Sequence, residues 1–266
     1  MLKNVFAGIL LLALVSCGHG SSNSKEAPKL TRGFQEHNIM STLWARHSGE
    51  FQALGYQAYH TAQIALDNAL RKKVKKPAVV ADLDETVLDN IEFQIRNIAK
   101  DQSYTPEAWT QWVNEARAGA IAGAVDFFKY AASKGVDIYY VSNRKINEVE
   151  ATFKNLNDLG LPAKKENLLF RDKEKSKEGR RQSVQKTHGY VLFIGDNLID
   201  FSNAFDDKSS QERKATVHNE KSHFGVDYII LPNPMYGSWE DVFYETNPRM
   251  GDAEKAAKRF EWLNKN

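Results

Sequence analysis

Cysteine is nearly absent from this sequence, with one residue, Cys17, among 266. A single cysteine can form no disulfide within the chain, so the fold must depend on a buried core. An excess of charge is lacking too, since 36 basic residues against 34 acidic ones leave a formal net charge of +2. That balance argues against a nucleic-acid partner bound through bulk charge. No apolar stretch of about 20 residues follows the N-terminal segment, so we expect no membrane-spanning helix in the mature chain.

The N-terminus has the pattern of a targeting segment. Lys3 precedes an almost wholly apolar run from Val5 to Val15, which is too short to span a bilayer comfortably. The run leads into the letters LVSC, which are typical of the lipobox after which bacterial lipoproteins are cleaved and acylated on cysteine. We therefore expect a signal peptide at 1–16 and a lipidated, flexible tether at 17–30, with Cys17 as the lipidation site. A plain secretory signal is the alternative.

Lipidation would make a membrane one of the partners of this chain. Acyl chains on one residue would anchor the protein in the bacterial cell envelope. Gly18 rather than Asp follows Cys17, which favours the outer membrane in enterobacteria-like sorting. The remaining residues, 31–266, are then expected to form one globular domain.

Five short apolar segments alternate with helical patterns along this domain. The segments are typical of buried parallel strands and lie at Ala78–Ala81, Val136–Val141, Asn167–Phe170, Tyr190–Ile194 and Tyr228–Leu231. Helices are predicted at about Gln35–Lys73, Gly123–Ala132, Ile146–Leu159, Lys177–His188 and Asp252–Leu263. The alternation predicts an α/β fold, with a parallel sheet covered by helices on both faces. Residues 91–120 are rich in polar and aromatic types and predict a small, mostly helical insert after the first strand.

Aspartates directly follow two of the predicted strands. Asp82 and Asp84 come after the first strand, in ADLDET, and Asp196 and Asp200 come after the fourth, in GDNLIDF. Ligands of open parallel sheets bind beyond the carboxyl ends of the strands, so these four carboxylates should meet there. They would repel one another without a cation, and an all-oxygen cluster favours a hard metal such as Mg²⁺. A single aspartate is often only a helix N-cap, but two pairs at two strand ends weaken that interpretation.

These side chains suit the hydrolysis of phosphate esters. A carboxylate nucleophile at Asp82 would form an aspartyl-phosphate, and Asp84 could serve as general acid in the first step and general base in the second. Ser142 follows the second predicted strand and could donate a hydrogen bond to a phosphoryl oxygen. Lys177 opens the helix after the third strand, where its ammonium would stabilise charge on the transferring phosphoryl group. The expected substrate is a small phosphate monoester.

Taken together, these motifs resemble those of a known enzyme family. DLDET, VSNR, the basic stretch with Lys177 and Arg180, and GDNLIDF are similar to the four ordered motifs of the haloacid dehalogenase superfamily. From Cys17 to about Trp239, the lipobox, DLDETVLDN, Trp109 and LPNPMYGSWE resemble the class C, or four-aspartate, bacterial acid phosphatases of the lipoprotein-e 5′-nucleotidase type. The resemblance implies a Rossmann-like fold of the haloacid dehalogenase type and an acid phosphatase that acts on 5′-nucleotides.

The resemblance also implies roles for the four aspartates. Asp82 would be the nucleophile and Asp84 the acid/base. A magnesium ion would be held by the Asp82 carboxylate, the main-chain carbonyl of Asp84 and the Asp196 carboxylate. Asp200 would support it through bound water.

Further roles concern the substrate. Ser142 and Lys177 would hold the phosphoryl group. Trp109 in the insert and Tyr236 in the loop after the fifth strand match aromatic residues that sandwich the leaving group, which is typically a nucleobase. The alternative for both is ordinary packing in the core, where large aromatic side chains are usually found.

Three functions stay open at this point. The first is magnesium-dependent hydrolysis of 5′-nucleotides, and the second is the same reaction on other monoesters, such as phosphotyrosine or a sugar phosphate. The third is a surface lipoprotein that binds haem or a nucleotide on the phosphatase scaffold, against which the intact set of four aspartates argues. The sequence leaves the oligomeric state open, with a homodimer as one option.

Overall fold

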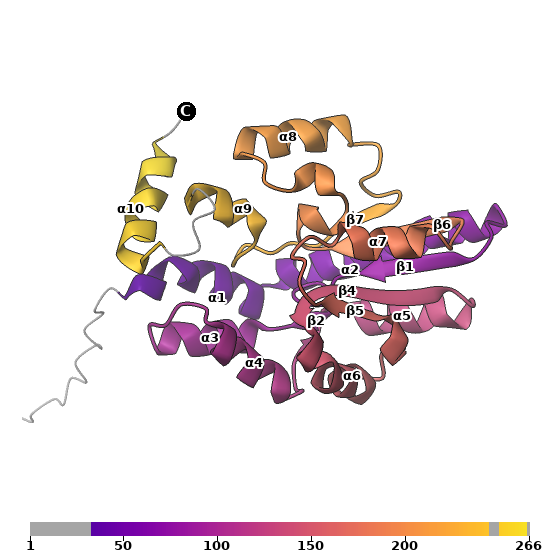
Figure 1. Ribbon diagram of the computed structural model, residues 1–266, viewed down its shortest axis with the longest axis horizontal. Coiled ribbons are helices and arrows are strands. Elements are labelled where there is room, and N and C mark those ends of the chain that lie inside the picture. Colours follow the sequence, from indigo (N-terminus) through magenta and orange to yellow (C-terminus); the bar gives the residue numbers. More distant parts are fainter. Residues whose placement is uncertain (1–32, 245–249, 265–266) are drawn as a thin grey trace, which may run out of the picture. The chain divides into compact units, whose positions relative to one another are not determined.

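The computed structural model describes residues 33–244 and 250–264 (Figure 1). The expected signal peptide, the tether and the lipidation site Cys17 lie outside these residues. Within the described ranges, no helix combines the length and the apolar character that crossing a membrane requires.

A five-stranded parallel sheet forms the centre of the domain, in the order β5-β4-β1-β6-β7. Its strands are β1 (Pro77–Ala81), β4 (Asp137–Lys145), β5 (Leu168–Arg171), β6 (Tyr190–Gly195) and β7 (Tyr228–Ile230). All five strands predicted from the sequence are present. A second, two-stranded antiparallel sheet pairs β2 (Leu88–Asp89) with β3 (Gly119–Ala120).

Helices connect the strands. The α-helices are α1 (Ile39–His47), α2 (Gly49–Arg71), α3 (Ile91–Ala99), α4 (Pro106–Asn114), α5 (Ala124–Ser133), α6 (Val149–Asp158), α7 (Glu178–Gln185), α8 (Ser210–Asn219), α9 (Ser238–Asp241) and α10 (Asp252–Leu263). Short 3₁₀ turns are η1 (Phe34–Asn38), η2 (Ile146–Glu148), η3 (Lys165–Asn167), η4 (Leu198–Asp200), η5 (Asn203–Phe205) and η6 (Val242–Tyr244). The predicted helical insert contains α3 and α4.

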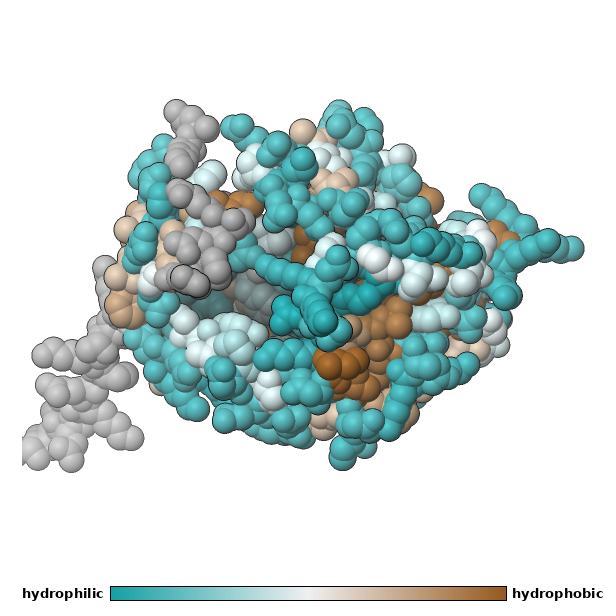
Figure 2. All heavy atoms as spheres, in the orientation of Figure 1, coloured by the Kyte–Doolittle hydropathy of each residue, from teal (hydrophilic) through white to brown (hydrophobic). Residues whose placement is uncertain are grey.

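Both faces of the sheet are buried, as the near-continuous apolar strands predict. Along β1, Val79 and Ala81 belong to one apolar cluster, and Ala78 and Val80 belong to another on the opposite face. In Figure 1, α5 and α6 lie on one side of the sheet and α7 lies on the other. The predicted α/β fold is therefore confirmed. Figure 2 shows that hydrophilic residues cover most of the displayed face, which agrees with the burial of apolar side chains inside.

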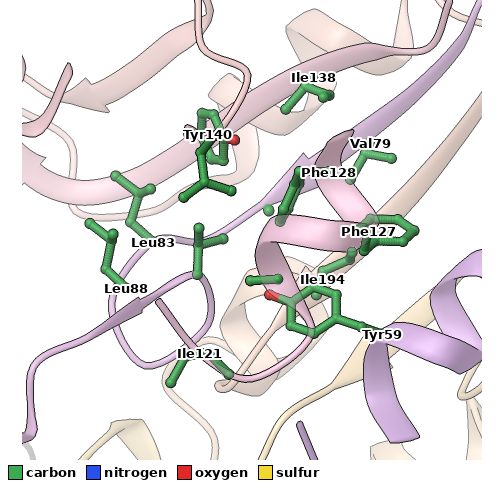
Figure 3. Packing of buried hydrophobic residues seen from close by; sticks show 14 of the residues in the cluster. Tyr59, Val79, Leu83, Leu88, Ile121, Phe127, Phe128, Ile138, Tyr140 and Ile194 are labelled. Carbon is green, nitrogen blue, oxygen red and sulfur yellow. The ribbon is translucent and has the colours of Figure 1, made fainter. Parts of the chain in front are cut away.

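The larger cluster is built around aromatic rings from α2, α5 and β4 (Figure 3). The ring centroid of Phe128 lies 5.2 Å from that of Phe127 and 5.5 Å from that of Tyr140. Leu83, just beyond β1, is fully buried in the same cluster. This leucine therefore fixes the segment that carries Asp82 and Asp84.

The structure differs from the sequence prediction at several places. The long helix predicted before β1 is interrupted at Ser48, whose hydroxyl accepts a hydrogen bond from the Phe51 amide (3.1 Å) and so caps a new helix, α2. Strand β4 extends to Lys145, so Ser142 lies inside the strand rather than after it. Helix α8 was not predicted, because its sequence is polar and has little apolar periodicity.

Candidate active site

The functional side chains gather beyond the carboxyl ends of the strands. In Figure 1, α1, α3, α4, α9 and α10 are grouped at that end of the sheet. A cavity of about 500 Å³ lies there, and its lining includes every site residue predicted within the described part of the chain. These residues are Asp82, Asp84, Trp109, Ser142, Lys177, Asp196, Asp200 and Tyr236.

A tight turn after β1 positions the first pair of aspartates. The Asp82 amide donates to the Ile194 carbonyl (3.0 Å) and so continues the hydrogen bonding between β1 and β6. The Leu83 carbonyl accepts from the amides of Val87 (2.9 Å) and Leu88 (2.8 Å), which turns the chain back at once. Leu83 points into the core, so the alternation along the chain leaves the aspartates on either side of it free to line the cavity.

Lys177 joins the two pairs of aspartates. Its Nζ atom lies 2.6 Å from Asp82 Oδ1 and 2.7 Å from Asp200 Oδ1, and only 4% of its side chain is exposed. Burial alone would lower the pKa of Lys177, but the carboxylates of Asp200 and Asp82 outweigh burial and raise this pKa above its ordinary value. The lysine is therefore a fixed cation at the edge of the sheet.

Three carboxylates converge closely enough to share one ion. Asp82, Asp196 and Asp200 each offer an oxygen, and these oxygens lie within 4.8 Å of one another. Burial, and then the charge of Asp200, raises the pKa of Asp196 to about 7. Burial also raises the pKa of Asp82, with Lys177 acting in the opposite direction. A hard cation bound here would relieve this unfavourable burial of charge, and oxygen donors suit it chemically.

Neighbouring groups orient Asp196 for such a role. Its Oδ1 accepts a hydrogen bond from Thr86 Oγ1 and its Oδ2 accepts one from Asn233 Nδ2, both at 2.9 Å. Partners of this kind commonly fix metal-binding carboxylates. Gly195, at the end of β6, permits the close approach of Asp200, because an added Cβ would lie 2.5 Å from the Asp200 Cβ.

The Asp84 carboxylate is not part of this three-carboxylate cluster and is instead paired with Arg144. Nη2 of Arg144 lies 2.7 Å from Asp84 Oδ1, and Asn90 Nδ2 donates to the same oxygen at 3.0 Å. Sequence reasoning did not single out either partner. The letters VSNR contain Arg144, but nothing in the sequence says which side chain it meets.

Ser142 and Arg180 connect β4 to the basic segment. Ser142 is completely buried, and its Oγ accepts a hydrogen bond from the Arg144 amide at 3.2 Å. Arg180 donates to the Ser142 carbonyl and to Asn143 Oδ1 (2.7 Å), so it braces the strand end. The cavity is lined by Ser142 but not by Arg180.

Aromatic rings form a wall of the cavity. Trp109 packs edge-to-face on Phe93, with centroids 5.0 Å apart, and lies 6.3 Å from Tyr104. The hydroxyl of Tyr236 donates to the buried carboxyl group of Glu85, which fixes the ring beside the turn after β1. Sequence reasoning missed Phe93 and Tyr104, for which the only signal was the aromatic content of the insert.

Known proteins are similar to this chain in sequence and in fold. A family model of the acid phosphatases of subfamily IIIB of the HAD superfamily matches residues 22–239. A structure of the class C acid phosphatase from Bacillus anthracis is 48% identical and superposes with a TM-score of 0.84, covering 88% of this chain and 99% of that chain. A structure of the class C acid phosphatase from the same organism with tungstate bound is 49% identical, with a TM-score of 0.84, and covers 87% of this chain and 98% of that chain. The present chain therefore belongs to the HAD subfamily IIIB acid phosphatases and is a phosphomonoesterase.

Proposed function

We propose that this phosphatase hydrolyses 5′-nucleotides at a magnesium site, with Asp82 as the nucleophile and Asp84 as the acid/base. The observation that carries the proposal is the cluster of Asp82, Asp196 and Asp200, which lies in the same cavity as the aromatic wall. The bound tungstate of the Bacillus anthracis relative supports an oxyanion-binding site, because tungstate, like phosphate, is an oxyanion.

The charge balance favours a divalent cation. When ionised, Asp82, Asp196 and Asp200 carry three negative charges, and Lys177, paired with two of them, supplies one positive charge, which leaves −2. When bound, Mg²⁺ would supply positive charge beside the phosphoryl oxygens and the attacking carboxylate. Asp82, Asp196 and the main-chain carbonyl of Asp84 would hold the ion, with Asp200 in support.

The residues of the chain then divide the reaction into two steps. In the first, a carboxylate oxygen of Asp82 attacks phosphorus, the bond to the ester oxygen breaks, and Asp84 gives its proton to that oxygen. In the second, Asp84 takes a proton from a water molecule that attacks phosphorus, and the Asp82 carboxylate is released together with phosphate. Lys177 and Ser142 stabilise the charge on the phosphoryl oxygens in both steps.

Replacement of the nucleophile tests this mechanism. Asp82→Asn keeps the size of the side chain but removes the attacking charge, so turnover of an aryl phosphate should fall by several orders of magnitude. Circular dichroism should show an unchanged fold. Asp158→Asn, which alters an exposed carboxylate at the end of α6, serves as the control and should keep full activity. Near-normal turnover by Asp82→Asn would overturn the assignment.

The metal can be tested by binding as well as by activity. A chelator should abolish the phosphatase activity, and added Mg²⁺ should restore that activity. Calorimetric titration of the metal-free protein with Mg²⁺ should show that Asp196→Asn lowers the affinity by about 10- to 100-fold or more, a loss that is typical even for groups that only orient a ligand. The Asp158→Asn control should bind as the wild type does. An enzyme that stays active in chelator, or equal affinities of the two variants, would contradict the magnesium site.

The aromatic wall predicts a preference for planar leaving groups. Stacking of a base on an aromatic ring contributes roughly 1–3 kcal/mol by alanine substitution, so Trp109→Ala or Tyr236→Ala should lower kcat/KM for adenosine monophosphate by roughly 5- to 100-fold. Glycerol phosphate has no planar group and should be affected much less. Phosphoryl contacts are shared, so the ratio of the two values isolates the stacking contribution. Equal losses on both substrates would favour the alternative of a phosphatase for non-nucleotide monoesters.

Export as a lipoprotein of the cell envelope, held in the outer membrane, forms a separate part of the proposal. It rests on LVSC and on Cys17 as the single cysteine. Cys17→Ser should abolish labelling by a radioactive fatty acid and release active enzyme from the membrane fraction, because Cys17 is distant in sequence from every active-site motif. Unchanged membrane association of the variant would refute the lipid anchor.

A further inference from the structure

The Asp84 carboxylate is held from two directions. Arg144 places Nε 3.1 Å and Nη2 2.7 Å from Oδ1, and Asn90 Nδ2 donates to this same oxygen at 3.0 Å. Oδ2 receives only the Arg144 Nε–H, shared with Oδ1, at 3.2 Å. The two carboxylate oxygens are therefore unequal, since one is saturated with donors and the other has acceptor capacity left.

Arg144 and Asn90 are themselves fixed by further hydrogen bonds. Arg144 Nη1 donates to Thr152 Oγ1 at 2.9 Å, and only 1% of the arginine side chain is exposed. Asn90 Oδ1 accepts from Trp112 Nε1 at 2.8 Å, and Asn90 is fully buried. Buried groups that are hydrogen-bonded on several sides have little freedom to move, so the orientation of Asp84 is fixed before any substrate binds.

We propose that Arg144 is a positioning residue that turns Asp84 so that Oδ2 carries the transferred proton while Oδ1 stays bound to Arg144 and Asn90. The inference rests on the proposed acid/base role of Asp84. It adds which carboxylate oxygen carries the proton and which residue selects that oxygen. The Asp84 side chain is 16% exposed and lines the cavity, so the oxygen with spare capacity can meet a leaving group there.

The atom assignment determines the proton path. As the bond from phosphorus to the ester oxygen breaks, the proton on Oδ2 passes to that oxygen, and the protonated leaving group departs as the alcohol. Asp84 becomes an anion paired with Arg144. Water then loses a proton to Oδ2 as it attacks the aspartyl-phosphate, which restores the acid for the next cycle. The bond of Arg144 to Oδ1 persists through both steps.

Substrates that differ in their need for a proton separate this role from a structural one. An alkoxide leaves poorly unless it is protonated, whereas a nitrophenolate leaves without a proton. The parameter kcat/KM reports the steps up to aspartyl-phosphate formation and is insensitive to the shared second step. Glycerol phosphate and nitrophenyl phosphate are therefore the probes.

The test uses Arg144→Lys in the full chain. Lysine keeps the charge but cannot reproduce the planar contact of a guanidinium with a carboxylate. We expect kcat/KM for glycerol phosphate to fall by roughly 100-fold or more, which is the usual size of general acid catalysis, and kcat/KM for nitrophenyl phosphate to fall less than about 10-fold. Arg144 also lies 5.7 Å from the Trp109 ring centroid. Loss of support for that ring would penalise the planar aryl ester more, which is the opposite direction.

Two further variants make the result specific. Arg180→Lys alters a nearby guanidinium that braces β4 without contacting Asp84, and it should lower both values by the same factor. In Asp84→Asn the acid is already lost, so adding Arg144→Lys should change the ratio of the two values less than twofold. This non-additivity is the signature of one residue acting through the other.

If Arg144→Lys folds poorly, Thr152→Val replaces it. The substitution removes the hydroxyl behind Arg144 while keeping the shape of the side chain, and it should shift the ratio in the same direction by a smaller factor. Equal losses on both esters in Arg144→Lys, or in Thr152→Val when that variant replaces it, would overturn the inference, as would full additivity with Asp84→Asn. Failure of the proposed function would instead show as an active Asp82→Asn enzyme, so the two failures can be told apart.

Discussion

The structure depends on the concentration of negative charge at one edge of a buried sheet. Asp82, Asp196 and Asp200 lie within reach of one ion in a place where burial disfavours the charged form. Lys177 joins two of them, and removing one partner of such a buried pair typically costs about 3–5 kcal/mol. The site is therefore stable only when all of these groups are present, because each carboxylate needs a cation or a hydrogen-bond donor beside it.

The fold meets this requirement by placing the charged groups on rigid elements. Asp82 continues the ladder of β1, and Asp200 approaches β6 closely because residue 195 is glycine. Leu83, buried between the two aspartates of the first pair, gives the turn an apolar anchor that a flexible loop would lack. Side chains fixed in this way lose little entropy when substrate binds, which favours precise positioning at the phosphoryl group.

The sequence predicts the strands and the aspartates well because both signals are local. A short apolar run followed by an acidic pair can be read without knowing its neighbours in space. Arg144 and Asp84 are 60 positions apart, so their contact depends on the register of β4 against β1 and not on any local pattern. Lys177 could likewise not be distinguished by composition from Lys173 and Lys175. In the structure it is separated from them by its burial and by its ion pairs with Asp82 and Asp200.

Two residues, Arg144 and Asn233, each contact both an aspartate of the site and an aromatic residue of the cavity. Arg144 holds Asp84 and lies over the ring of Trp109. Asn233 donates to Asp196, and its side-chain oxygen accepts from the amide of Tyr236 at 3.4 Å. Tyr236 contributes its main-chain amide to this contact, and the bonds of Arg144 to Asp84 do not involve the Trp109 ring, so loss of either ring leaves Asp84 and Asp196 with their donors. The coupling therefore runs in one direction: replacement of Arg144 or Asn233 affects both the polar groups and the aromatic residues of the cavity, whereas replacement of an aromatic ring acts mainly on the leaving group.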